Sequence, residues 1–158
     1  ATLILAWFIL HGAGSIGYDK AQTKVALNDL QARSKRVAEQ GDEVLFISER
    51  HLLAVGLIED VPLIPEYERD VLMEMVMSRN KSYLDGFYAD LQNQRFGLIV
   101  LEPQKDKLVG VESAFGAENN LWVLKVTHPL WCYYEPTVLY ESVGIELYTP
   151  RAEVLDCN

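Results

Sequence analysis

"FGLIVLEP", residues 96–103, contains four consecutive apolar residues and ends in a glutamate and a proline. A short apolar run that is bounded by turn signals is typical of a β-strand buried on both faces. Glycine and proline at its two ends limit how far such a strand extends. We therefore expect a central strand here, in a sheet that is covered on both sides.

Segments of helical and extended pattern alternate on either side of this strand. Helices are predicted over residues 18–40, 66–78 and 82–93, and further strands over 43–48, 130–136 and 144–150. Residues 104–116 form a polar loop, and 117–127 fit either a helix or a strand. The alternation predicts an α/β fold, a Rossmann-like layered sandwich with a mostly parallel sheet. The last two strands, joined by a short link, give a possible antiparallel edge.

Composition narrows the class of protein. The chain has 158 residues, of which 49% are hydrophobic and 23% charged, enough for one domain with a proper core. Its formal net charge is −9, and the one basic cluster is Arg33, Lys35 and Arg36. A nucleic-acid binder needs clustered Lys and Arg, so we predict no nucleic-acid partner.

The opening residues 1–10, "ATLILAWFIL", are almost entirely apolar. Ten residues are too few to span a bilayer, which takes about 20, and no basic region precedes them. We expect residues 1–12 to be the end of a membrane helix or an apolar lead-in. A single soluble α/β domain is then expected over 18–151, followed by a tail at 152–158.

Gly12, Gly14 and Gly17 have the spacing of a dinucleotide-binding fingerprint. In that motif an acidic residue about 20 positions later holds the ribose, whereas the acid after the next strand here is Glu49. Asp19, in the first turn of the predicted helix, would also repel a phosphate. We expect a flexible exit from the membrane and no cofactor, and a nucleotide-binding Rossmann domain stands as the alternative.

Carboxylates come at the ends of four extended segments, namely three of the predicted strands and the short proline-bounded piece "VPLIP", residues 61–65. The candidate ligand-binding residues are Glu49, Arg50, His51, Glu66, Glu102 and Glu135. Ligands of open α/β sheets bind outside the carboxyl ends of the strands, so such a rim could hold sugar hydroxyls or a divalent cation. The alternative is a set of solvated loop acids and helix caps. No catalytic residue and no metal-binding motif can be named from the sequence.

Cys132 and Cys157 fit no zinc or CxxC spacing. They are either two separate thiols or a disulfide that attaches the C-terminal tail to the predicted strand "LWCYY". The second reading requires an oxidising compartment.

The segments "GDEVLFISERHLL", "VPLIPEYERDVLMEM", "FYADLQNQRFGLIVLEP", "AENNLWV" and "CYYEP" carry a resemblance that covers residues 40–151. They resemble the C-terminal soluble region of large, uncharacterised multi-pass membrane proteins of cyanobacteria and related bacteria. More distantly, the layout is similar to that of C-type glycosyltransferases, which use lipid-linked sugars. In those enzymes the catalytic Asp lies between early membrane helices, so the resemblance transfers no catalytic residue.

The resemblance implies an extracytoplasmic accessory domain, attached to the membrane through the upstream part of the chain and not catalytic by itself. Its partners would be the membrane and a sugar or lipid-linked sugar. A structural interaction domain without a ligand is a further alternative, and a featureless rim at the strand ends would favour it.

Overall fold

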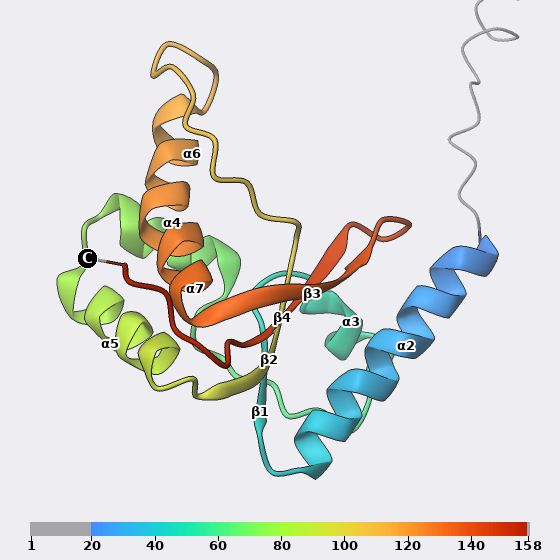
Figure 1. Ribbon diagram of the computed structural model, residues 1–158. Helices are drawn as coiled ribbons and strands as arrows, with labels where there is room; N and C mark the ends of the chain where they lie inside the picture. The colour runs from blue at the N-terminus through green and yellow to red at the C-terminus, as the bar shows by residue number, and fades with distance from the viewer. Residues whose placement is uncertain (1–19, 158) are drawn as a thin grey trace, which may run out of the picture.

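The computed structural model describes residues 20–157, which form a four-stranded mixed sheet with helices on both sides (Figure 1). The strands are β1 (Glu43–Phe46), β2 (Phe96–Leu101), β3 (Tyr134–Tyr140) and β4 (Ile145–Pro150), in the spatial order β1-β2-β4-β3. β1 and β2 are parallel, while β4 is antiparallel to both of its neighbours, β2 and β3.

The predicted mostly parallel, Rossmann-like sandwich is therefore wrong, although the fold is α/β. The reason lies in the β3–β4 hairpin, whose turn ends at Gly144 with a φ of +64°. Strands that are joined by a tight turn must run antiparallel. Because this hairpin makes up half of the sheet and inserts β4 next to β2, β1–β2 is the one parallel pair.

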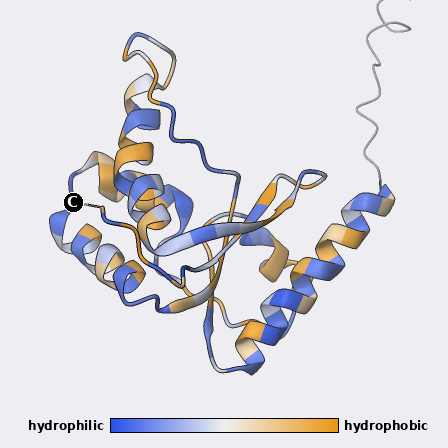
Figure 2. Ribbon diagram, viewed as in Figure 1, coloured by the Kyte–Doolittle hydropathy of each residue, from blue (hydrophilic) through white to orange (hydrophobic). Residues whose placement is uncertain are grey.

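The helices of the described chain confirm most of the predicted helical segments. They are α2 (Lys20–Glu39), α3 (His51–Ala54), α4 (Arg69–Met77), α5 (Lys81–Gln92), α6 (Gly116–Trp122), the π-helical η1 (Val123–Thr127) and α7 (His128–Tyr133). Figure 2 shows hydrophobic and hydrophilic residues alternating along α2 and α5, as expected of helices that pack by one face. No helix within residues 20–157 is long and apolar enough to cross a membrane.

The strand predicted over residues 130–136 begins late, because residues 130–133 are helical and belong to α7. The buried residues Val123, Val126, Thr127 and Leu130 follow a helical i, i+3, i+4, i+7 spacing. This stripe faces the core, so tertiary packing outweighs the strand preference of the aromatic residues that follow it.

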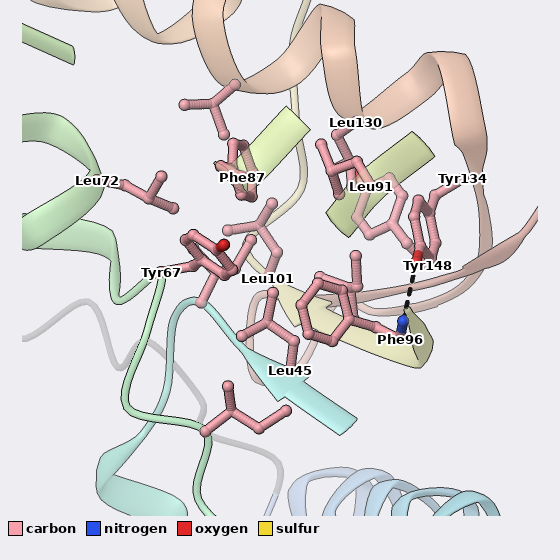
Figure 3. Close-up of a cluster of buried hydrophobic side chains, with 14 of the residues drawn as sticks. Leu45, Tyr67, Leu72, Phe87, Leu91, Phe96, Leu101, Leu130, Tyr134 and Tyr148 are labelled. Carbon is pink, nitrogen blue, oxygen red and sulfur yellow. Dashed lines mark hydrogen bonds between the residues drawn. The ribbon is translucent and has the colours of Figure 1, made fainter. Parts of the chain in front are cut away.

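Two hydrophobic clusters cover the two faces of the sheet. Leu98 and Val100 of β2 pack with Leu30 of α2, whereas Ile99 and Leu101 pack on the opposite face. That second cluster also holds the buried side chains of α4, α5 and α7, including Leu72, Phe87, Leu91 and Leu130 (Figure 3). β2 is thus buried on both faces, as the apolar run predicts.

Part of the predicted organisation lies outside the described residues. This applies to residues 1–12 and to the glycines Gly12, Gly14 and Gly17.

Candidate functional site

A polar cleft of about 480 Å³ lies at the carboxyl ends of β1 and β2. The residues directly after β1 form one side, Glu102 after β2 contributes to the floor, and the first turn of α4 closes the other side. The backbone N–H of Arg69 donates to the carbonyl of Ile47 at 3.0 Å, which attaches the start of α4 to the end of β1. We call this site the β1–β2 cleft.

Glu102 is the centre of the β1–β2 cleft. Its Oε2 accepts a hydrogen bond from the Ser48 hydroxyl, and its Oε1 accepts one from Arg69 Nε at 2.9 Å. The carboxylate is 32% exposed, so its remaining acceptor capacity faces the solvent of the cleft. Ser48 is itself 8% exposed and is positioned by the ladder between β1 and β2.

Arg50 shapes the cleft through backbone contacts. Its guanidinium donates to the carbonyls of Phe46, Pro65 and Glu66, at 2.8, 3.2 and 2.7 Å. Burial lowers the pKa of Arg50, but a guanidinium stays protonated at any physiological pH. The side chain therefore ties the end of β1 to the segment before α4. Glu66 takes part in this contact through its carbonyl and is not among the residues that line the cleft.

Glu49 and His51 form a pair at the mouth of the cleft. His51 Nδ1 lies 3.4 Å from Glu49 Oε2, with the imidazole 65% and the carboxylate 31% exposed. Glu49 adopts a left-handed conformation with a φ of +60°, which is uncommon for a residue other than glycine. The structure thus supplies His51 with a carboxylate neighbour two residues away in the chain.

Glu135 lies away from the other candidates. It is the second residue of β3, where it contacts Arg151 at 3.3 Å. The neighbouring Tyr134 accepts a hydrogen bond from the N–H of Phe96, the first residue of β2, so this part of β3 lies at the opposite edge of the sheet. The sequence predicted a strand over residues 130–136 with Glu135 near its carboxyl end, whereas β3 begins at Tyr134 and continues to Tyr140.

Sequence reasoning missed the contribution of α4. Glu68, Arg69 and Asp70 line the cleft together with Ser48, and none of these four is among the candidates taken from the sequence. The available signal was the predicted helix start near residue 66, since the helix after a strand can place its first turn at that strand's carboxyl end. The register that brings Arg69 to Glu102 could not be read from spacing.

The β1–β2 cleft combines acceptors and donors of both charges within a small volume. Carboxylates, guanidinium groups and a hydroxyl together match ligands whose hydroxyl groups both donate and accept. Across residues 20–157, no three His, Cys, Asp or Glu side chains are grouped so that they could hold a metal ion.

Cys132 and Cys157 form a disulfide, with their Cα atoms 6.0 Å apart. Cys132 lies in α7 rather than in a strand, and the N–H of Leu155 donates to its carbonyl at 3.0 Å. The C-terminal tail is thereby held against α7, beside a second groove of about 610 Å³ whose lining includes Tyr88 and Trp131.

Comparison with protein-family models, curated proteins and solved structures found nothing that matches this chain. Its function is therefore inferred from the described residues and their geometry.

Proposed function

We propose that this chain is an extracytoplasmic accessory domain of a multi-pass membrane protein, and that its β1–β2 cleft binds sugar hydroxyls. The ligand is a sugar or the sugar part of a lipid-linked sugar, and the parent protein is a glycosyltransferase that uses such a donor. The domain presents or encloses the ligand and leaves the chemical step to another part of the protein.

The proposal depends on the hydrogen bonds that the Glu102 carboxylate makes. A carboxylate that is held by Ser48 and Arg69, and still partly exposed in a cleft, is pre-positioned to accept from a hydroxyl. Arg69 and His51 also line the cleft and add donors to it. This convergence of polar groups at the strand ends, together with the partial exposure of Glu102, favours ligand binding.

Two features support the proposed location. One is the Cys132–Cys157 disulfide, because disulfides persist in oxidising compartments and are rare in cytosolic proteins. The apolar residues 1–10 supply a segment of the kind that leads into a bilayer. The dinucleotide alternative is not proposed, because the sheet described within residues 20–157 is mixed and lacks the parallel βαβαβ halves around which that site is built.

The test is a titration of the ¹⁵N-labelled chain with a panel of sugars: glucose, mannose, galactose and N-acetylglucosamine. We expect the amide signals of Ser48, His51 and Arg69 to shift with one of them. Glu102→Gln should weaken that binding by about tenfold, because hydrogen bonds to a charged group contribute about 1.5–3 kcal/mol. Glu135→Gln, at the opposite edge of the sheet, is the matched control and should leave the affinity unchanged.

Two results would contradict the sugar site. One is the absence of any shift at the cleft amides across the panel. The other is an equal loss of affinity in the Glu102→Gln and Glu135→Gln variants, which would place the binding elsewhere on the chain.

A further inference from the structure

The loop between β2 and α6, residues 104–115, presents three strongly exposed apolar side chains. The exposed fractions are 48% for Leu108, 77% for Val111 and 79% for Phe115. In Figure 1 this loop extends beyond the upper end of α6 and is the highest described part of the molecule. One exposed apolar side chain needs no explanation, but three on one projecting loop indicate a contact surface. We call residues 104–115 the projecting loop.

The projecting loop is held in shape by specific contacts. The N–H of Val109 donates to Asn120 Oδ1 at 2.9 Å, and Asn120 Nδ2 donates back to the Val109 carbonyl at 2.8 Å. A Cβ at Gly116 would lie only 2.3 Å from the Gly110 carbonyl oxygen, so glycine allows the close approach at the base of the loop. Phe115 is exposed in a left-handed conformation with a φ of +57°. The exposed apolar side chains therefore lie on a loop whose backbone conformation is fixed by specific contacts.

The charges of the projecting loop identify the kind of surface that it suits. Lys105 and Lys107 are balanced by Asp106 and Glu112, whereas the whole chain carries −9. A net negative protein is repelled by an anionic membrane surface. A neutral loop with exposed apolar side chains instead suits a zwitterionic bilayer, into which it inserts by the hydrophobic effect.

The chain before α2 limits how far a bilayer at residues 1–10 can lie from the described domain. α2 begins at Lys20, and the sequence before it contains the apolar residues 1–10. In Figure 1 the projecting loop lies at the upper left, and the Lys20 end of α2 lies at the right, lower than the loop and at the upper end of its own helix. A fully extended chain over residues 11–19 spans at most about 30 Å, which bounds the distance from Lys20 to the apolar segment.

We propose that the projecting loop inserts Val111 and Phe115 into the interface of a zwitterionic bilayer. It is a second membrane contact besides residues 1–10, and it fixes which face of the domain is turned towards the lipid. This inference rests on the proposed membrane attachment. It concerns a different surface from the β1–β2 cleft.

The test places an environment-sensitive NBD fluorophore on the full chain at Val111→Cys. The two native cysteines are bonded to each other, so the introduced thiol is the single labelling site. The matched control carries the label at Glu39→Cys, an exposed position in the last turn of α2 at the lower part of Figure 1. Phosphatidylcholine vesicles are added, and sedimentation measures separately how much chain they bind.

With vesicles, we expect the label at Val111→Cys to shift to shorter wavelength and brighten at least about threefold, because it leaves water for an apolar surface. The label at Glu39→Cys should not respond. Adding Phe115→Asp should abolish the response, whereas Val55→Asp, which changes a valine that is 65% exposed on another part of the surface, should preserve it.

The failures are distinguishable. A chain that sediments with the vesicles while the label at Val111→Cys stays unchanged overturns the inference but leaves the membrane attachment standing. A chain that does not sediment with them overturns both. A response that survives Phe115→Asp but not Val55→Asp also overturns the inference.

Discussion

Gly97 in β2 and Gly86 in α5 have opposite structural roles. Substitution by alanine is expected to have opposite effects at the two positions. A Cβ at Gly97 in β2 would lie 2.8 Å from both Asp42 Cβ and Val37 Cγ1, at the end of α2. A Cβ at Gly86 in α5 would meet only the Tyr67 hydroxyl, at an ordinary 3.7 Å. The first glycine lets the end of α2 approach the central strand, while the second weakens a helix.

We therefore expect Gly97→Ala to lower the free energy of unfolding by about 1–3 kcal/mol, because the helix end or the strand must move. Gly86→Ala should raise it by about 0.5–1 kcal/mol, the usual preference for alanine inside a helix. Urea unfolding of the two variants measures both changes. Equal shifts of the same sign would mean that the packing of α2 on β2 is looser than described.

Individual residues also show which parts of the candidate site could be predicted from the sequence and which could not. The structure brings Glu49, His51 and Glu102 into one cleft, because the carboxyl ends of the parallel strands β1 and β2 meet at one edge. Glu135 was placed wrongly because aromatic residues before it resemble a strand but end α7. Arg69 was not found, since its contact with Glu102 depends on how α4 docks.

At the scale of elements, strong local patterns succeeded and long-range pairing did not. The apolar run of β2 and the periodic pattern of α2 are properties of their own residues, and both elements formed where predicted. The insertion of β4 between β2 and β3 is set by competition among all the strands for partners. No periodicity in the sequence records that competition, which is why the predicted parallel sheet was wrong.

The disulfide connects α7 to the C-terminal tail, in addition to the hydrogen bond from the Leu155 N–H to the Cys132 carbonyl. It closes a loop with a sequence separation of 25 residues, for which the chain-entropy relation gives about 3.5 kcal/mol. We expect Cys157→Ser to lower the free energy of unfolding by up to that amount. Thermal unfolding with and without reductant measures it, and reductant should have no further effect on the variant. A variant as stable as the oxidised native chain would show that the tail contributes nothing.

At the scale of the whole molecule, several buried tyrosines determine how the domain responds to alkali. Burial raises the pKa of Tyr67, Tyr140 and Tyr148, whose hydroxyls donate to the carboxylates of Asp90, Asp29 and Glu146. Burial also raises the pKa of Tyr134 to about 12, although its hydrogen bond from the Phe96 N–H acts in the opposite direction. These phenols hold together both faces of the sheet, because they lie in or beside the two hydrophobic clusters.

The sign of the effect follows from the direction of these shifts. A group whose pKa is raised by folding contributes stability that is complete below its unfolded pKa, about 10 for tyrosine, and that is lost as the pH rises through the folded pKa. We therefore expect the domain to unfold cooperatively above about pH 10, with phenolate absorbance at 295 nm rising together with the loss of far-UV circular dichroism. In concentrated urea the same chain should titrate its tyrosines near pH 10 in a broad, ordinary curve. The native chain could instead give that broad curve while keeping its circular dichroism. Hydroxide would then reach the buried phenols without unfolding. The core shown in Figure 3 would in that case be less tightly packed than described.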